Sequence, residues 1–115
     1  MENITINGHI WFQTASGLRI GEGRAKLLEE IENSGSISEA ARKLEIPYRR
    51  AWGMIKDMNT NAKESLVIKE VGGKDGGRSI LTEEGEKIVA LFKKINKCFK
   101  EFSEDESSRI SGGEK

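Results

Sequence analysis

Residues 36–58 read SISEAARKLEIPYRRAWGMIKDM and predict two short amphipathic helices separated by a tight turn. Ser36 and Glu39 have the spacing of a capping box, in which a side-chain oxygen accepts from a free N–H at a helix start. Apolar residues then recur at helical intervals and give each helix one inward face. Pro47 suits the start of the second helix, because its fixed φ fits there and its missing N–H costs little.

The second helix, predicted over 47–61, carries Tyr48, Arg49 and Arg50 in its first turn. A helix that enters the major groove reads base edges with its N-terminal residues, and the fork of a guanidinium matches guanine. An Arg-Arg pair alone is more often a solvated charge pair. Together with the capped helix before it and the basic hairpin after it, the pair favours a helix-turn-helix that binds DNA.

Two strand-like runs, 66–71 and 79–82, flank the glycine-rich stretch GGKDGGR. A phosphate-binding P-loop needs a strand-to-helix context and a Gly-Lys-Ser/Thr ending, and neither is present. We interpret the stretch as the wing of a winged helix, where glycines allow close approach to the sugar-phosphate chain and Lys74 and Arg78 supply charge. A mobile loop in solvent is the alternative.

Short strand-like runs at 10–14 and 18–20 predict an N-terminal hairpin, with an earlier Asn-Gly pair as a competing turn signal. Alternation along the first run places either Trp11 or Phe12 inward, and the sequence does not decide between them. A further helix fills the stretch between this hairpin and the capping box.

Thr82 caps a last, long helix whose apolar residues recur at alternating intervals of three and four. This seam packs either on the protein's own core or against a second copy of the chain. Cys98 on the seam is interpreted as a small buried hydrophobe. The polar stretch that follows predicts a division into a domain over 1–102 and a disordered tail over 103–115. The candidate dimer-interface residues are Ile88, Leu91, Ile95, Cys98 and Phe102.

Composition sets bounds on function. Basic and acidic side chains both number 19, but residues 36–79 carry nine basic and six acidic ones, which weakly supports nucleic acid as a partner. One Cys and one His leave no material for a disulfide and little for a zinc site or a Cys–His nucleophile. No pair of carboxylates sets an acid against a base, so we expect neither an enzyme nor a bound cofactor. No apolar run reaches the length of a membrane span, and we expect a cytoplasmic protein.

The stretches IGEGRAKLLEEIENSGSISEAARKLEIPYRRAWGMIKDMN and LVIKEVGGKDGGRSILTEEGEKIV resemble the N-terminal DNA-binding domain of the molybdate-responsive transcription regulators of the ModE type. The resemblance covers roughly residues 9–100 and rests on GSIS followed by two alanines, on the Tyr-Arg-Arg-Ala-Trp run, and on the wing that closes in Leu-Thr-x-x-Gly. It implies an α+β winged helix-turn-helix that binds double-stranded DNA as a homodimer. The DNA contacts that it implies are Ser38, Tyr48, Arg49, Arg50, Lys56, Lys74, Gly76, Gly77 and Arg78.

The sequence also departs from the family's pattern. Pro47 stands where a capping serine is common, and Asp75 interrupts the glycines of the wing. The oxyanion-binding domains of the full-length regulators are absent from these 115 residues, so we expect molybdate sensing to need a separate oxyanion-sensing partner.

Two readings of the function follow. The favoured one is a sequence-specific, homodimeric transcriptional regulator. The alternative is a winged helix used for protein–protein contact, as in an adaptor without DNA binding, which the zero net charge and Asp75 favour slightly. Trp52 is interpreted as a packing residue. Gly53 costs a helix about 1 kcal/mol relative to Ala, which a close approach of another segment would explain.

Overall fold

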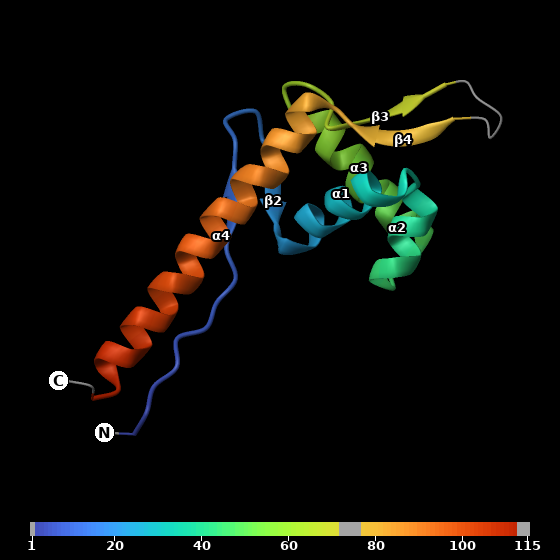
Figure 1. Ribbon diagram of the computed structural model, residues 1–115. Helices are drawn as coiled ribbons and strands as arrows, with labels where there is room; N and C mark the ends of the chain where they lie inside the picture. The colour runs from blue at the N-terminus through green and yellow to red at the C-terminus, as the bar shows by residue number, and fades with distance from the viewer. Residues whose placement is uncertain (1, 72–76, 113–115) are drawn as a thin grey trace.

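Both helices predicted from residues 36–58 are present in the computed structural model, which describes residues 2–71 and 77–112. The described residues form four helices and two antiparallel hairpins (Figure 1). This arrangement confirms the predicted α+β winged helix, with an N-terminal hairpin, a three-helix core, a two-stranded wing and a long C-terminal helix. The elements are β1 (Trp11–Gln13), β2 (Arg19–Gly21), α1 (Glu22–Ser34), α2 (Ile37–Leu44), α3 (Tyr48–Asn61), β3 (Val67–Glu70), β4 (Arg78–Leu81) and α4 (Glu83–Ile110).

Capping chemistry sets the ends of α2. The Ser36 hydroxyl accepts a hydrogen bond from the Glu39 N–H at 3.1 Å, as the capping box predicts. Gly35 ends α1 with a φ of +75°, a left-handed conformation that glycine adopts at little cost. Pro47 is the N-cap of α3, so the helix begins one residue later than predicted, at Tyr48.

The N-terminal hairpin resolves the choice between the two neighbouring aromatic residues. Trp11 pairs with Gly21 and Phe12 with Ile20, which places the turn after residue 14 and not at the earlier Asn-Gly pair. Phe12 is half-buried and packs on the core, with its ring 6.5 Å from that of Phe92. Trp11 is exposed and has the Arg19 guanidinium 5.2 Å above its ring.

The hydrophobic core lies around α1, which contacts α2, α4, β2 and β4. Each fully buried aliphatic side chain contributes about 1.5–3 kcal/mol relative to an exposed one, so the inward faces of the short elements hold this small domain together. The core confirms the predicted inward faces of the first three helices. Its largest fully buried side chains are Ile20, Leu27, Leu28, Ile31, Met58 and Leu66.

Asn59 joins the end of α3 to the start of β3. Its side-chain oxygen accepts from the N–H groups of Leu66 and Val67, at 2.8 and 3.3 Å, and its amide nitrogen donates to the Val67 carbonyl at 2.9 Å. Three hydrogen bonds from one partly buried side chain therefore hold the wing to α3.

Replacing Asn59 with Ala is expected to lower the free energy of unfolding by about 2–3 kcal/mol, because each net hydrogen bond is worth about 1 kcal/mol and two backbone donors lose their partner. Urea denaturation would measure the loss as a lower midpoint at an unchanged slope. The matched control is Asn33→Ala, since Asn33 is exposed on α1 and its side chain has no hydrogen bond among the described residues. Equal changes in the two variants would contradict the proposed bridging role.

The first turn of α4 is fixed to the base of the wing. Thr82 caps the helix by accepting from the Gly85 N–H at 3.0 Å, and its own hydroxyl donates to the Ser65 carbonyl at 2.7 Å. The Thr82 N–H donates to the Leu66 carbonyl at 2.9 Å. These bonds set the direction in which α4 leaves the wing.

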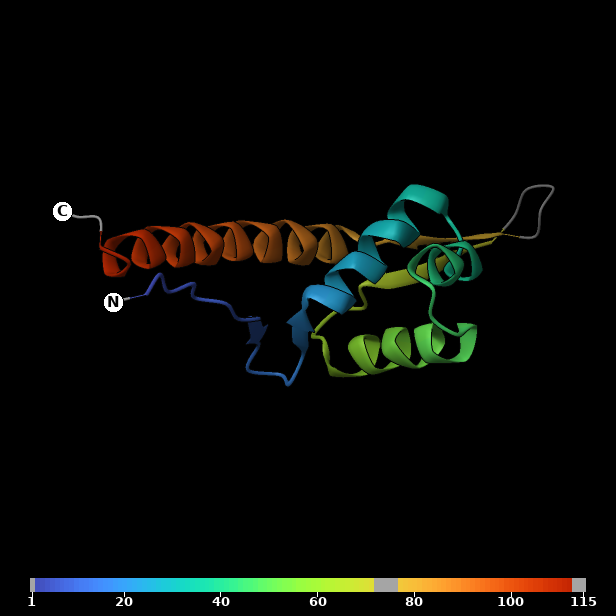
Figure 2. The same ribbon diagram turned by 90° about the horizontal axis from the view of Figure 1, so that it is seen from below.

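α4 extends well beyond the core, and the N-terminal segment runs alongside it in the opposite direction (Figures 1 and 2). The Ser107 hydroxyl accepts from the Ile6 N–H at 2.8 Å, and the Ser111 hydroxyl accepts from the Ile4 N–H at 2.7 Å. The prediction of a disordered tail over 103–115 is therefore wrong for the residues up to Ile110, because α4 and these hydrogen bonds order the polar stretch. Residues 113–115 lie outside the described residues.

Candidate nucleic-acid interface

α3 presents one face to the core and the opposite face to solvent. Ala51, Ile55 and Met58 are buried. At about 3.6 residues per turn, Arg49 lies on the opposite face, whereas Arg50 lies nearer its edge. With Arg49 on the outward face are Gly53, Lys56 and Thr60, all exposed.

The cationic side chains on the solvent side of α3 are available to bind an anionic partner. Among the described residues, neither Arg49 nor Arg50 nor Lys56 forms an ion pair. Asp57, the acidic residue of α3, is instead paired with Arg24 of α1 at 2.7 Å. α3 therefore offers cationic donors whose charge no described carboxylate neutralises at close range.

Trp52 does not pack inward as predicted, because its side chain is 45% exposed. It follows the buried Ala51 by one residue, and a step of one residue turns a side chain away from the buried face. Tyr48, one turn earlier, is similarly exposed at 49%. The two aromatic rings therefore lie one turn apart along one edge of α3. The helical spacing of the apolar Ala51, Ile55 and Met58 is the sequence signal that places Trp52 off the buried face.

Gly53 has no close neighbour within the chain. A Cβ added at this position would meet no heavy atom within 4 Å. The close approach that its presence suggested is therefore not made by any described part of the protein.

The described part of the wing needs glycine at one position. Gly77 has a φ of +112°, and a Cβ there would lie 2.6 Å from the Glu70 carbonyl oxygen. Arg78 is exposed, and its Nε lies 3.4 Å from the point where a Cβ on Gly35 would sit. The predicted contacts Lys74 and Gly76 lie outside the described residues.

The structure brings four of the predicted DNA contacts around one small cavity, namely Ser38, Tyr48, Gly77 and Arg78. The start of α2, the first turn of α3 and the wing thus form one continuous surface. Lys69 and Ser79 line the same cavity and were not predicted. They form a cross-strand pair, but the sequence does not reveal that this pair faces α2.

The predicted dimer seam is divided between two environments. Ile88 is only 6% exposed and belongs to the protein's own core, together with Phe92. Leu91 and Phe102 are 44% and 55% exposed, and Ile95 is half-buried. The interpretation of Cys98 as a buried hydrophobe is wrong, because its thiol is exposed on the outer side of α4.

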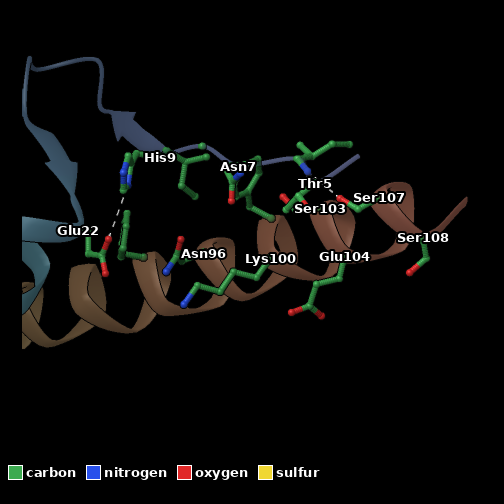
Figure 3. Close-up of a pocket in the computed structure, with 15 residues that line it drawn as sticks. Thr5, Asn7, His9, Glu22, Asn96, Lys100, Ser103, Glu104, Ser107 and Ser108 are labelled. Carbon is green, nitrogen blue, oxygen red and sulfur yellow. Dashed lines mark hydrogen bonds and ion pairs between the residues drawn. The ribbon is translucent and has the colours of Figure 1, made fainter. Parts of the chain in front are cut away.

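A larger groove of about 700 Å³ lies between the N-terminal segment and α4 (Figure 3). Polar side chains line most of it, among them Asn7, Asn96 and Lys100. His9 lies 3.8 Å from Glu22 at one end. The Ser103 hydroxyl is buried without a hydrogen-bond partner among the described residues. The described residues that line this groove form no catalytic or metal-binding arrangement.

Titratable groups away from this surface show no catalytic arrangement in the described part of the chain. Desolvation and the nearby Glu86 carboxylate raise the pKa of Glu32, but Glu32 lies on α1 and Glu86 on α4, outside the interface. Over residues 2–71 and 77–112, no cluster of His, Cys, Asp and Glu is suited to a metal ion. No described helix is both long enough and apolar enough to cross a membrane.

Comparisons with known proteins identify relatives of the chain. No protein-family model matches the chain. It is 40% identical over 82 residues to the molybdenum transport protein ModE of Azotobacter vinelandii, covering 71% of this chain and 30% of that protein. It is 45% identical over 69 residues to the transcriptional regulator ModE of Yersinia pestis, covering 60% and 26%. The DNA-binding transcriptional dual regulator ModE of Escherichia coli is 36% identical over 88 residues, covering 73% and 34%.

The chain therefore spans about a third or less of the length of these relatives. The similarity extends over most of the chain, and the fold it carries is the winged helix-turn-helix described above. Over the residues matched, the chain is a homologue of the ModE-type molybdate regulators.

Proposed function

We propose that this chain is a transcriptional regulator that binds double-stranded DNA in a sequence-specific manner, as a homodimer. The observation that carries the proposal is the outward face of α3, where cationic side chains stand without ion-pair partners among the described residues. Several relatives are named as transcriptional regulators, and that of Escherichia coli also as DNA-binding. A regulator of this kind would act in the cytoplasm.

In the proposed complex, α3 lies in the major groove and the wing follows the neighbouring backbone. Arg49 and Arg50 contact base edges from the first turn, where a recognition helix reaches deepest. Lys56 lies farther along the same helix and contacts phosphate. Lys74 and Gly76 extend the contact along the wing, which stays a prediction from the sequence.

The second copy is proposed to pack on the outer side of α4. Leu91, Ile95, Cys98 and Phe102 are wholly or partly exposed there, and a large apolar side chain in solvent gains free energy when it is covered. Ile88 is left out, since the protein's own core already buries it. The N-terminal hairpin, with its exposed Trp11, is the other candidate for the dimer contact.

A separate oxyanion-sensing partner is a further part of the proposal. Its support is that relatives named for molybdenum are more than twice as long as this chain, which matches 30% and 28% of their length. Such a partner would supply the sensing, and this domain would supply the contact with DNA.

The decisive test is selection from a pool of random duplex DNA at about 50 and 200 mM salt, followed by sequencing. We expect an enriched, two-fold symmetric motif, and affinity that falls steeply with salt as counterions are released from phosphate. The half-site spacing would report the geometry of the dimer.

A folded protein that enriches no motif would contradict the proposal. Binding without salt dependence to a protein partner would instead support the adaptor, which the zero net charge favours. An Arg109→Ala variant is the matched control for variants of Arg49 and Arg50, since Arg109 lies in the last turn of α4 and pairs with Glu106. That end of α4 is far from the wing (Figure 1).

A further inference from the structure

A small cavity of about 140 Å³ lies where α2, α3 and the wing meet. Ser38 lines it from the first turn of α2, Tyr48 from the start of α3, and Lys69, Arg78 and Ser79 from the two wing strands. One liquid water occupies about 30 Å³, so the cavity has room for a tetrahedral oxyanion with a few waters.

The charge of the cavity favours an anion. Lys69 and Arg78 both line it, and no Asp or Glu is among the described residues around it. Neither cation forms an ion pair with a described carboxylate. Two unneutralised positive charges thus face a space with no internal counter-charge.

Hydrogen-bond donors are available in the same cavity. Ser79 is only 4% exposed, yet its hydroxyl has no hydrogen-bond partner among the described residues. The N–H groups of Ile37 and Ser38 open α2 and likewise have no partner in the described part of the chain, whereas the next one is taken by the Ser36 cap. The Ser79 side chain lines the cavity, so a ligand oxygen there would accept from its hydroxyl and from these two N–H groups.

The two sides of the cavity are fixed relative to each other. The Ser79 N–H donates to the Gly35 carbonyl at 2.9 Å, which attaches the wing to the turn before α2. Gly35 has no side chain to displace the Arg78 guanidinium, which lies against it. The cationic and the N–H side of the cavity are therefore held in place before any ligand arrives.

We propose that this cavity binds one phosphodiester of the DNA backbone, clamped between the helix-turn-helix and the wing by Lys69, Arg78 and Ser79. The inference rests on the proposed function and deepens it, because it assigns the clamp to two residues that the sequence does not mark as contacts. A free oxyanion such as phosphate or molybdate has the same chemistry and is the other source to be distinguished.

The test compares Lys69→Ala with the wild-type protein on duplex DNA over a range of salt. We expect about a tenfold loss of affinity on every sequence alike, and a plot of log affinity against log salt that is shallower by about one unit. Lys26→Ala is the matched control, since Lys26 is exposed on α1 and pairs locally with Glu22. A wild-type protein that binds DNA while Lys69→Ala keeps the same affinity and slope would overturn the clamp.

Ser79→Ala separates folding from binding. No hydrogen bond of the Ser79 hydroxyl is present among the described residues, so its removal should change the free energy of unfolding little, and weaker DNA binding at unchanged stability cannot come from unfolding. Unchanged DNA binding in Ser79→Ala would remove Ser79 from the clamp. A change of sequence preference in Lys69→Ala without a change of slope would mean that Lys69 contacts a base, and would also overturn the proposal.

If the wild-type protein binds no duplex at all, the proposed function fails and the cavity is tested separately. Amide resonances of Ser38 and Ser79 would be followed by NMR during titration with inorganic phosphate and with molybdate. A saturable shift that Lys69→Ala abolishes would assign the cavity to a free oxyanion and overturn the DNA phosphate as its occupant. The absence of any shift would overturn the site altogether.

Discussion

Replacing Arg49 with Ala is expected to lower affinity for the preferred DNA site about 5- to 150-fold, which corresponds to about 1–3 kcal/mol for a bidentate arginine–guanine pair. Arg49 is exposed on the face of α3 opposite the buried Ala51, and no described carboxylate pairs with it. Because the lost contact is to a base, affinity for unrelated duplexes should fall much less. Competition between the selected motif and its single-base variants would show the lost preference at one position of each half-site.

Two further variants serve as comparisons for Arg49→Ala. Arg50→Ala should cost less, since Arg50 lies nearer the edge of the outward face, and Arg109→Ala should change nothing because it is remote and already paired. If Arg49→Ala instead weakens all duplexes by the same factor and flattens the salt dependence, Arg49 contacts phosphate and the assignment to a base is wrong.

Replacing Gly85 with Ala is expected to destabilise the protein by about 3 kcal/mol or more. A Cβ at this position would lie 2.4 Å from the Leu66 carbonyl oxygen and 3.2 Å from its carbon. That carbonyl is part of the backbone, and it is held by Thr82 on one side and, through the Leu66 N–H, by Asn59 on the other. Overpacking against atoms that cannot move away outweighs the roughly 1 kcal/mol that Ala gains over Gly in a helix.

The matched control for Gly85 is Gly53, which is also a helical glycine but meets nothing within 4 Å. Gly53→Ala should raise the free energy of unfolding by up to about 1 kcal/mol. Thermal or urea denaturation of both variants would therefore show shifts of opposite sign. A Gly85→Ala variant as stable as the wild type would contradict the prediction, because it would mean that the Leu66 backbone moves easily to make room for the methyl group.

Gly53→Ala also carries information on recognition. Its methyl group would project from the outward face of α3 one turn after Arg49, into space that the protein itself leaves open. A more stable variant that binds DNA less tightly would show that the glycine serves the approach of DNA at some cost in helix stability.

The local features of the fold were predictable because their chemistry lies within a few residues. The Ser36 cap, the left-handed Gly35 and the Thr82 cap each depend on neighbours three or four positions away. The wing strands were predicted from the strand-like runs on either side of the glycine-rich stretch, within one residue of their observed ends. These signals were sufficient for the α+β winged helix.

Features that depend on distant partners were not predictable in the same way. The order of the segment after Ser103 depends on hydroxyls that bond to Ile4 and Ile6, about a hundred residues earlier in the chain. A polar composition predicts disorder when no partner is in view. The cavity between α2 and the wing is a similar case, because Lys69 faces α2 only through the path of the backbone.

The bonds between Ile4 and Ser111 have a consequence for the topology of the chain. The Ile4 N–H and the Ser111 hydroxyl lie 2.7 Å apart, so both ends of the described chain meet at the tip of α4 farthest from the wing (Figure 1). A short peptide would close the backbone into a ring there, and new ends opened in another exposed loop would give a circular permutant with the same neighbours throughout. The fold would thus be the same although the elements follow one another in a different order along the chain.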